Sequence, residues 1–311
     1  MKQHVCAIIL DYFGADKTKQ SVLSLVGQDL RTVYVLDNSG SDSASANLRS
    51  TFADLTAANT GFKIKFLTTG KNLGFGGGVN FVLAHDRRSE SPHDYYLLLN
   101  NDAIAGPGLV SGLVSTLKKD PQAALAAPRV VSSDPSREYG IWYHRYLGLL
   151  LSKPGMLRFH YYTGCCLLFS KALVIDDAVF DEAFFMYGED TELGWRLLRE
   201  GKKTRCAEDV YVEHEYGPSV DRSSFFYEYH MARGHFLVSF KTYVHPVEIP
   251  FLILTKLTAM ALRSLARTLR HRTFAPLKAL CCVWFRLKTV ELSVRLNESR
   301  QTKSPTTIYG K

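Results

Sequence analysis

The chain has 311 residues, of which 46% are hydrophobic and 22% charged, a composition that excludes an intrinsically disordered protein and fits one large α/β domain with an appendage, or two domains. The formal net charge is +8, yet residues 241–311 hold 13 Lys/Arg and 3 Asp/Glu, a net charge of +10, while residues 1–240 carry −2. A nearly neutral body with a basic C-terminal region indicates an anionic partner, for which nucleic acid and lipid are the candidates.

The chain passes from Met1 into an apolar run, Val5–Leu10, that is too short for the apolar core of a signal peptide. Six cysteines are present, but no CxxC pair with the spacing of a zinc site. We therefore expect a cytosolic protein with reduced thiols, several of them buried.

Residues 1–42 follow a strand–helix–strand pattern. The run Val5–Leu10 predicts a buried parallel strand, and it ends in Asp11-Tyr12. A helix is predicted from about Lys17 to Val26 and a second strand over Thr32–Leu36, followed by the polar residues 37–42. Polar residues at the carboxyl ends of successive strands are typical of a doubly wound α/β sheet, in which ligands bind at that edge.

A glycine-rich segment follows the third predicted strand. A helix is predicted over Leu48–Ala58 and a strand over Lys63–Leu67, after which residues 72–80 read Asn-Leu-Gly-Phe-Gly-Gly-Gly-Val-Asn and lead into a helix predicted over Val79–His85. Glycines before a helix let backbone N–H groups approach a phosphate or a sugar. The spacing is not G-x-G-x-x-G, and the segment belongs to the third strand–helix unit, so a Rossmann-type oxidoreductase is not favoured.

The apolar run Tyr96–Leu99 ends abruptly in three polar residues, Asn100, Asn101 and Asp102. We expect these side chains at the mouth of a site on the carboxyl edge of the sheet. Oxygen ligands of this kind suit Mg²⁺ or Mn²⁺, and a metal there could hold a diphosphate. The alternative is a strand followed by an ordinary Asn/Asp turn.

The middle of the chain is less regular. A helix is predicted over Pro107–Lys118, a short strand over Ala123–Val131 that Pro128 breaks, and a buried strand over Thr163–Phe169. Residues 132–160 show no clean period, and we expect an irregular excursion near the acceptor side of the site.

Glu189 and Asp190 are predicted to lie at the N-terminus of a helix that ends before Gly201. The helix macrodipole stabilises carboxylates there, and the preceding Phe-Phe-Met-Tyr would surround an acid with apolar surface, as active sites often do. The alternative is a pair of ordinary acids at a helix N-terminus. In this helix we expect Leu193, Leu197 and Leu198 to face inward and Glu192, Arg196 and Arg199 to face outward.

The alternating residues Val210–Glu215 predict a strand that contains His214. A lone histidine at a strand end is usually an ordinary polar residue, although neutral imidazole is also a common metal ligand.

From Tyr227 onward the chain is predicted to be helical and basic. The segments Pro250–Leu269 and Leu277–Leu296 combine large apolar residues with Lys/Arg, and neither contains 18 uncharged residues in a row, so no transmembrane helix is expected. Such helices suit the interface of an anionic bilayer, and the alternative is packing on the catalytic domain or on a second copy of the chain. Nucleic acid is disfavoured because the basic residues lie among large aliphatic side chains. The final residues, 297–311, are expected to be frayed.

Taken together, these motifs resemble the family 2 inverting glycosyltransferases, in particular the rhamnosyltransferase-like branch, over about residues 4–240. The matching segments, in family order, are the opening strand with Asp11-Tyr12, residues 35–42, residues 72–80, residues 98–102, residues 188–197 and His214 followed by Gly217 and Ser219.

The resemblance implies a GT-A fold, a nucleotide-binding mixed α/β sheet flanked by helices, with a divalent cation, Mg²⁺ or Mn²⁺. It implies Asp190 as the general base, Asp102 and His214 as metal ligands, and Asp37 as a partner of the pyrimidine ring. The donor-binding residues it implies are Asp11, Tyr12, Asp37, Asn38, Asn72, Gly74, Gly76, Gly77, Asn80, Asn100, Asn101 and Asp102, and the acceptor or supporting residues are Glu189, Trp195 and Arg233.

The chain departs from the family pattern at two places. The metal motif often has two acids, but its first position here is Asn100, which leaves one carboxylate. Relatives often have Arg-Asn where this chain has Arg233-Gly234, so Arg233 is the plausible diphosphate contact of that pair.

The resemblance therefore implies an inverting glycosyltransferase with a catalytic domain over residues 1–240. The basic helical region expected over residues 241–311 lies outside the family motifs and is predicted from the residue pattern alone. The enzyme would move a sugar from dTDP-rhamnose or a UDP-hexose to a hydroxyl of a glycan acceptor in surface polysaccharide biosynthesis of the O-antigen or capsule type. The basic amphipathic region beside a cytosolic site indicates that this acceptor is a glycan on a lipid diphosphate carrier. The basic helices would hold the enzyme at the cytoplasmic face of the inner membrane. The alternative is a non-catalytic module that binds a nucleotide-sugar or a membrane and tolerates loss of Asp190.

Overall fold

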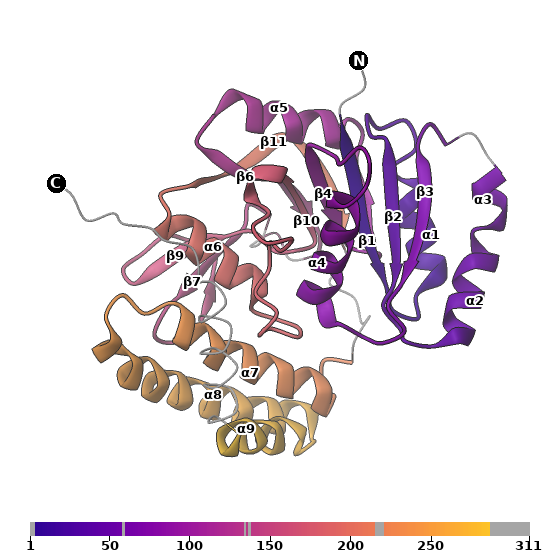
Figure 1. Ribbon diagram of the computed structural model, residues 1–311. Helices are drawn as coiled ribbons and strands as arrows, with labels where there is room; N and C mark the ends of the chain where they lie inside the picture. Colours follow the sequence, from indigo (N-terminus) through magenta and orange to yellow (C-terminus); the bar gives the residue numbers. More distant parts are fainter. Residues whose placement is uncertain (1–3, 58–59, 134, 136–137, 215–220, 287–311) are drawn as a thin grey trace.

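The structure is a computed structural model that describes residues 4–57, 60–133, 135, 138–214 and 221–286 (Figure 1). Within these ranges the centre is a mixed sheet of eight strands. In spatial order they are β3 (Lys63–Thr68), β2 (Thr32–Asp37), β1 (Val5–Asp11), β4 (Tyr95–Leu99), β10 (Cys166–Ser170), β6 (Ala123–Val131), β11 (Lys203–His214) and β5 (Ala103–Ala105). Strands β3, β2, β1 and β4 are parallel, so their carboxyl ends meet at one edge, as the sequence predicts.

The described part of residues 132–160 does not form the irregular excursion that we expected. It forms most of a small antiparallel sheet in the order β8 (Leu150–Leu151), β7 (Ile141–His144) and β9 (Arg158–Tyr161). Ile141, Tyr143, Phe159 and Tyr161 alternate inward and are buried. Strands of two to four residues are too short to show a clear period in the sequence, which is why the pattern was missed.

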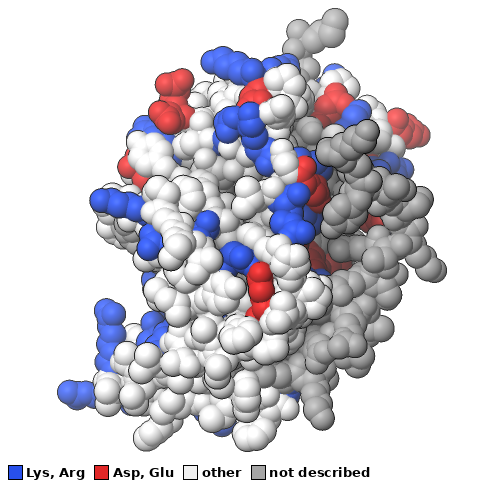
Figure 2. All heavy atoms as spheres, turned by 90° about the vertical axis from the view of Figure 1, so that its left-hand side faces the viewer, with Lys and Arg blue, Asp and Glu red and all other residues white. Residues whose placement is uncertain are grey.

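Three helices, α7 (Phe225–Lys241), α8 (Ile249–His271) and α9 (Ala275–Phe285), pack together below the sheet in Figure 1, with the short helix η3 (Pro246–Glu248) before α8. Figure 2 shows that the lower part of one face, at the level of these helices, is mostly uncharged, with Lys and Arg at its margin. By length and composition alone, residues Pro246–His271 could cross a membrane, with 22% of the apolar window buried, so the expectation that no helix is long and apolar enough is not supported.

Helix α7 also packs against the small sheet through Leu237 and Val238, so it contacts both parts of the molecule. The domain boundary expected at residue 240 falls at the end of this helix and stays a prediction. The expected helix beyond residue 286 and the frayed end over 297–311 lie outside the described residues.

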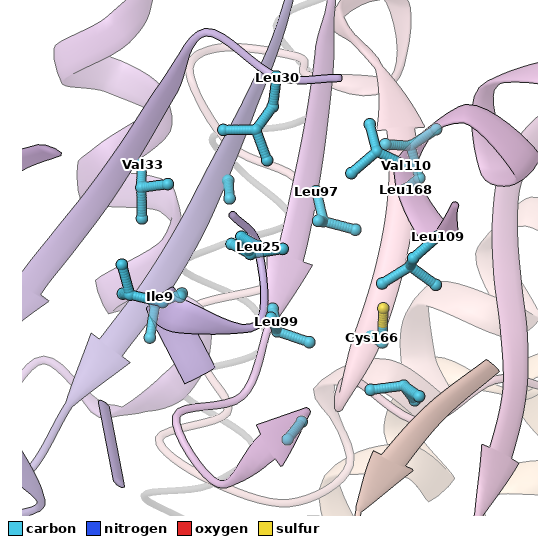
Figure 3. Packing of buried hydrophobic residues seen from close by; sticks show 14 of the residues in the cluster. Ile9, Leu25, Leu30, Val33, Leu97, Leu99, Leu109, Val110, Cys166 and Leu168 are labelled. Carbon is cyan, nitrogen blue, oxygen red and sulfur yellow. The ribbon is translucent and has the colours of Figure 1, made fainter. Parts of the chain in front are cut away.

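Apolar cores cover both faces of the large sheet. One core packs the sheet against α1 (Ala15–Leu23), α2 (Asp42–Thr51), α3 (Ala53–Ala57) and α5 (Leu109–Lys119), and Figure 3 shows its side chains from β1, β2, β4 and β10 meeting those of the helices. The other packs the sheet against α4 (Gly74–Arg87) and α6 (Glu189–Arg199), with the short helix η2 (Lys171–Leu173) beside it. This sandwich leaves the carboxyl edge of the parallel strands uncovered for a ligand.

Several expected boundaries were wrong for local reasons. The helix expected over Leu48–Ala58 begins earlier, at Asp42, because the Ser41 hydroxyl accepts a hydrogen bond from Ala44 N and caps the helix. Pro128 does not break β6; instead the pairing register with β11 shifts beside it, between Ala207 and Tyr211, because proline has no N–H to donate.

The inner face of α6 also differs from the prediction. Leu198 is 55% exposed. Glu192 is buried, and its carboxylate accepts a hydrogen bond from the guanidinium group of Arg196 at 3.0 Å. The carboxylate tolerates burial because this ion pair and its hydrogen bonds replace water.

Candidate active site

A cavity of about 600 Å³ opens at the carboxyl edge of the parallel strands. It lies between the ends of β1 and β4, the start of α6, and α7. The predicted site residues that line it are Tyr12, Asn38, Asn72, Gly74, Asn100, Asn101, Asp102, Glu189, Asp190 and His214. The fold therefore gathers residues that are more than 200 positions apart in the sequence into one pocket.

Asp102 and His214 meet because β5 pairs antiparallel with β11, which places His214 opposite Ala103. The distance from His214 Nε2 to Asp102 Oδ1 is 3.2 Å, and Asn100 Nδ2 lies 3.5 Å from the same nitrogen. Burial alone would raise the pKa of Asp102, but the hydrogen bond and charge of His214, together with the nearby charge of Lys17, hold it below its usual value. Asp102 is therefore an anion inside the pocket.

This pair fits a divalent cation. A carboxylate oxygen and a neutral imidazole nitrogen are common ligands of Mn²⁺ and its neighbours, and both atoms belong to residues that line the cavity. With one carboxylate, the protein alone supplies few ligands, and the remaining positions suit phosphate and water oxygens.

Glu189 and Asp190 begin α6, directly after Gly188, whose φ of +106° places it in the left-handed region. Asp190 accepts hydrogen bonds from Gly164 N at 3.3 Å and Thr191 N at 2.7 Å. Burial raises the pKa of Asp190 despite these hydrogen bonds. Burial also raises the pKa of Glu189, as does the neighbouring Asp190, and Glu189 Oε2 is buried without a hydrogen bond among the described residues.

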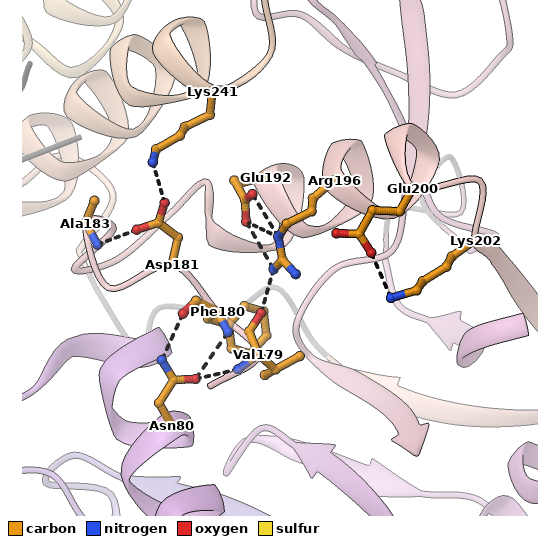
Figure 4. A network of polar contacts seen from close by, with 10 residues as sticks. All are labelled: Asn80, Val179, Phe180, Asp181, Ala183, Glu192, Arg196, Glu200, Lys202 and Lys241. Carbon is orange, nitrogen blue, oxygen red and sulfur yellow. Dashed lines mark hydrogen bonds and ion pairs between the residues drawn. The ribbon is translucent and has the colours of Figure 1, made fainter. Parts of the chain in front are cut away.

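The loop that precedes α6 is held by polar contacts from three helices (Figure 4). The Asn80 side chain accepts hydrogen bonds from Val179 N and Phe180 N and donates one to Phe180 O. Asp181 pairs with Lys241 at 2.9 Å. Because both ends of these contacts are buried, the loop presents residues 186–190 to the pocket in a fixed position.

Two predicted donor-binding amides also build the pocket wall. Asn38 accepts a hydrogen bond from Leu73 N and donates one to Gly74 O, which joins the end of β2 to the start of α4. Asn72 Oδ1 accepts from Gly74 N at 2.8 Å. Helix α4 begins at Gly74, so the glycines lie within the helix, not in a loop before it as we expected.

Two predicted acids are buried beside the pocket. Asp11 accepts a hydrogen bond from Thr18 Oγ1 at 2.5 Å, and Asn101 Nδ2 donates to the same hydroxyl at 3.1 Å, which ties β1 to the end of β4. Asp37 accepts from Ser39 N at 2.9 Å and from the Ser45 hydroxyl. Neither lines the cavity, and a contact of Asp37 with a pyrimidine ring stays a prediction.

Five predicted site residues lie elsewhere. Gly76 and Gly77 face Phe180 and Leu73 inside the structure, and the Asn80 amide is used by the loop before α6. Trp195 is buried under the guanidinium of Arg145, and Arg233 donates to Ala183 O at 2.8 Å. None of these five residues lines the cavity, so they shape the pocket only from outside. They are Gly76, Gly77, Asn80, Trp195 and Arg233.

Sequence reasoning missed several lining residues, among them Lys17, Arg222, Tyr143 and His235. The sequence could have identified Lys17, since it lies six residues after Asp11 at the start of the first helix, on the edge where polar residues gather. No sequence feature identified Tyr143 and His235, because they reach the pocket only through the packing of β7 and α7.

Comparison with known proteins identifies relatives. A family model described as Glycosyl transferase family 2 matches residues 6–176. Two curated proteins of Mycobacterium tuberculosis, from strains CDC 1551 / Oshkosh and ATCC 25618 / H37Rv, are 27% identical to this chain, and both are named N-acetylglucosaminyl-diphospho-decaprenol L-rhamnosyltransferase. The match covers 51% of this chain and 61% of the length of each relative.

Two solved structures share the fold. The crystal structure of GalNAc-T7 with UDP, GalNAc and Mn²⁺ has a TM-score of 0.57 at 11% identity, covering 75% of this chain and 47% of that chain. The mannosyltransferase PcManGT from Pyrobaculum calidifontis, in complex with GDP-Man and Mn²⁺, has a TM-score of 0.51 at 15% identity, covering 98% of this chain and 81% of that chain. These likenesses confirm the predicted GT-A fold.

Proposed function

This chain belongs to glycosyl transferase family 2, and we propose that it transfers a sugar from a pyrimidine nucleotide-sugar to a hydroxyl group of a lipid-linked glycan acceptor. The observation that carries this proposal is the single cavity that holds both the Asp102–His214 pair and Asp190. The rhamnosyltransferase relatives favour dTDP-rhamnose over a UDP-hexose as the donor and an N-acetylglucosaminyl diphosphate lipid as the acceptor. Such a reaction belongs to surface polysaccharide biosynthesis, of which the O-antigen and capsule types are examples.

On the donor side, Asp102 and His214 would hold Mg²⁺ or Mn²⁺, which when bound would offset the negative charge of the leaving diphosphate. Lys17 lines the same part of the cavity and adds a positive charge beside Asp102. Asn72 and Gly74 form the wall where the nucleoside or its sugar would lie.

On the acceptor side, the Asp190 carboxylate takes the proton of the attacking hydroxyl. The hydroxyl oxygen forms a bond to the anomeric carbon while the bond from that carbon to the diphosphate oxygen breaks, and the nucleoside diphosphate leaves. This single displacement inverts the anomeric centre and needs no second carboxylate as a nucleophile. Glu189, whose raised pKa favours the protonated form, is placed to donate a hydrogen bond to the acceptor.

The C-terminal helices would bring this site to the cytoplasmic face of the inner membrane. Three basic residues of α8 face the protein: Lys256 is buried, and Arg263 and Arg267 pair with Glu228 of α7. The solvent-facing side is an apolar stripe, which we call the α8 stripe, of Phe251, Leu254, Leu262, Leu265 and Leu269, each at least 50% exposed. An apolar stripe with basic residues such as Arg270 and Arg272 near its end suits an anionic bilayer.

Calorimetric titration of the whole chain with dTDP, UDP, GDP and NAD⁺, with Mn²⁺ and again with EDTA, tests the donor site. We expect dTDP or UDP to bind with Mn²⁺, and binding to weaken by roughly 10- to 100-fold in Asp102→Asn, the usual effect of removing a group that serves a metal site. Asp54→Asn is the matched control, because Asp54 is an exposed carboxylate paired with Lys19. Binding of NAD⁺ alone, or nucleotide binding indifferent to both EDTA and Asp102→Asn, would contradict the proposal.

A further inference from the structure

A buried chain of three polar side chains leads from α8 to the pocket. Lys256 is fully buried and its Nζ donates to the Tyr143 hydroxyl at 2.9 Å. The Tyr143 oxygen lies 2.9 Å from His235 Nδ1, and the two rings are stacked with centroids 5.9 Å apart. Tyr143 and His235 line the cavity, so the chain links a buried amine to the pocket wall.

The buried Lys256 amine has no carboxylate beside it among the described residues. Within the described residues, no carboxylate lies within 4.0 Å of its Nζ, whereas the nearby Arg145 pairs with Glu248 at 2.6 Å. Burial, and then the charge of Arg145, lowers the pKa of Lys256. This shift favours the neutral amine when no anion is near, and an anion placed in the adjoining pocket would favour the protonated form of Lys256.

The hydrogen bonds also define what the chain presents to a ligand. Lys256 donates to the Tyr143 oxygen, so the Tyr143 proton points to His235 Nδ1. Burial, together with the charges of Lys256 and Arg263, lowers the pKa of His235 to about 3, so its ring is neutral and carries its one proton on Nε2. Nε2 makes no hydrogen bond to another described residue, which leaves this N–H free to donate into the cavity.

We propose that His235 and Tyr143, backed by Lys256, form an anion-binding subsite for a phosphate group of the acceptor. This inference rests on the proposed function, since it concerns the acceptor half of the same pocket. His235 Nε2–H donates to a phosphate oxygen, and Lys256 acts through Tyr143 as a positioning residue, which gains positive charge when the bound anion favours its protonation.

The position of the subsite agrees with an acceptor whose sugar precedes a lipid diphosphate. The neighbour of His235 in α7, Gly234, packs on the backbone of Tyr187, and Val238 packs near Gly188, directly before the Glu189-Asp190 pair. The subsite therefore lies on the α7 side of the carboxylates, and Lys256 belongs to the helix that carries the α8 stripe. A sugar at Asp190 would direct its diphosphate toward these helices and its lipid toward the bilayer.

Titration with two soluble acceptor head groups tests the subsite directly. The probes are N-acetylglucosaminyl α-1-diphosphate and the methyl glycoside of N-acetylglucosamine, each added to the whole chain with and without dTDP and Mn²⁺. We expect the wild type to bind the diphosphate about tenfold more tightly than the glycoside, because a hydrogen bond to an ionised group contributes more than a neutral one. Equal affinity for the two probes overturns the inference.

Substitutions test which side chains cause the preference for the diphosphate over the glycoside. Lys256→Met removes the buried amine while keeping its volume, and it is expected to keep or raise the unfolding temperature while losing the preference for the diphosphate. Lys278→Met, which removes an exposed lysine of α9, should leave the preference unchanged. If Lys256→Met keeps the preference, the inference is wrong.

A pair of histidine variants covers the case in which a substitution at Lys256 prevents folding. His235→Gln retains an N–H near the Nε2 position, and His235→Asn retains a polar group only near Nδ1. We expect the preference for the diphosphate to survive in His235→Gln and to be lost in His235→Asn, with dTDP affinity unchanged in both. If the wild type does not bind dTDP, the proposed function is contradicted. The titrations of the two head groups without nucleotide then still test whether the subsite exists.

Discussion

Asp190 is the residue in which position most clearly sets chemistry. The helix N-terminus and the hydrogen bonds from Gly164 and Thr191 favour the carboxylate, while burial opposes it. The balance raises the pKa of Asp190, which makes the carboxylate a stronger base than an exposed aspartate.

Replacing Asp190 by Asn should therefore lower the rate of transfer by about 10² to 10⁴, because the amide cannot take the proton of the acceptor hydroxyl. In the wild type, activity should fall as the pH drops through the raised pKa of Asp190, that is, at a higher pH than the ordinary aspartate value of about 3.9. Steady-state rates with dTDP-rhamnose across pH 4–8 measure both effects. Glu189→Gln is the matched control and should keep the acid limb, since burial raises the pKa of Glu189 to about 8 and Glu189 therefore holds its proton across the acid part of that range. Near-normal turnover by Asp190→Asn would show that Asp190 is not the general base.

Asp86 of α4 shows the opposite case, a buried carboxylate that serves the fold. It accepts hydrogen bonds from the hydroxyls of Tyr34 and Tyr96 and from N and Nδ1 of His93. Its oxygens are thus occupied, and although Cys6, Asp86 and His93 are close enough to suggest a metal site, we interpret them as a structural network of the core.

Burial alone would raise the pKa of Asp86, but the contacts of His93 and Tyr34 lower it to about 2. The folded value is below the unfolded value of about 3.9, so this contribution to stability is present above pH 4 and is lost as the pH falls toward 2. We expect Asp86→Asn to lower the free energy of unfolding by about 3 kcal/mol at pH 7, measured by urea denaturation. Asp54→Asn, at an exposed ion pair, should change little; equal effects of the two substitutions would refute the role of the network.

At the scale of the element, helix α4 and the loop before α6 depend on each other. Gly74 has a φ of +73°, and a Cβ there would lie 2.1 Å from Phe185 O. Phe75 N donates to the same carbonyl at 2.8 Å, so the first turn of α4 fixes the loop that carries residues 186–190. The glycine is required by close backbone approach as well as by its dihedral angle.

Gly70 provides a matched control for this position, since its φ is +67° and nothing lies within 4 Å of where its Cβ would be. Gly70→Ala should cost only the left-handed strain, about 1 kcal/mol in the free energy of unfolding. Gly74→Ala adds a clash with the Phe185 backbone and should cost more and also weaken nucleotide binding. Urea denaturation and calorimetry measure the two effects, and equal losses in both variants would show that packing against Phe185 has no influence.

At the scale of the whole molecule, helix α8 exposes one apolar stripe and turns Lys256, Arg263 and Arg267 toward the protein. Helix α8 places Met260 in a small core with Phe236 of α7 and Val283 of α9, so its inner face is used by the fold. Removing residues 245–311 would expose that core, and substitutions on the α8 stripe are a sharper test of membrane binding.

The double substitution Leu254→Ser and Leu262→Ser should abolish most sedimentation of the protein with vesicles of anionic phospholipid, because each leucine loses about 1.5–3 kcal/mol of apolar burial in the bilayer. Leu23→Ser on α1, also an exposed leucine, should have no effect. If the double variant still binds the vesicles and the wild type sediments equally with neutral vesicles, the α8 stripe is not the membrane surface.

The sequence alone determined which polar segments meet at the carboxyl edge of the sheet. Apolar runs that end in Asp11 and in Asn100-Asn101-Asp102 identify an edge, because parallel strands bring their carboxyl ends together whatever the details of packing. This is why an α/β sheet with a ligand site at this edge could be predicted from the residues, whereas the GT-A fold and the roles of the site residues were predicted from the family resemblance.

Only the tertiary structure decided which side chains turn toward the pocket and which support it from behind. Asn80, Trp195 and Arg233 lie in motif segments, yet their polar or aromatic groups are used by contacts inside the protein. Tyr143 and His235 lie in unremarked segments and line the pocket. A local pattern reports the exposure of one element, whereas contacts between β7, α7 and α8 depend on how distant elements pack, and no local period encodes that packing.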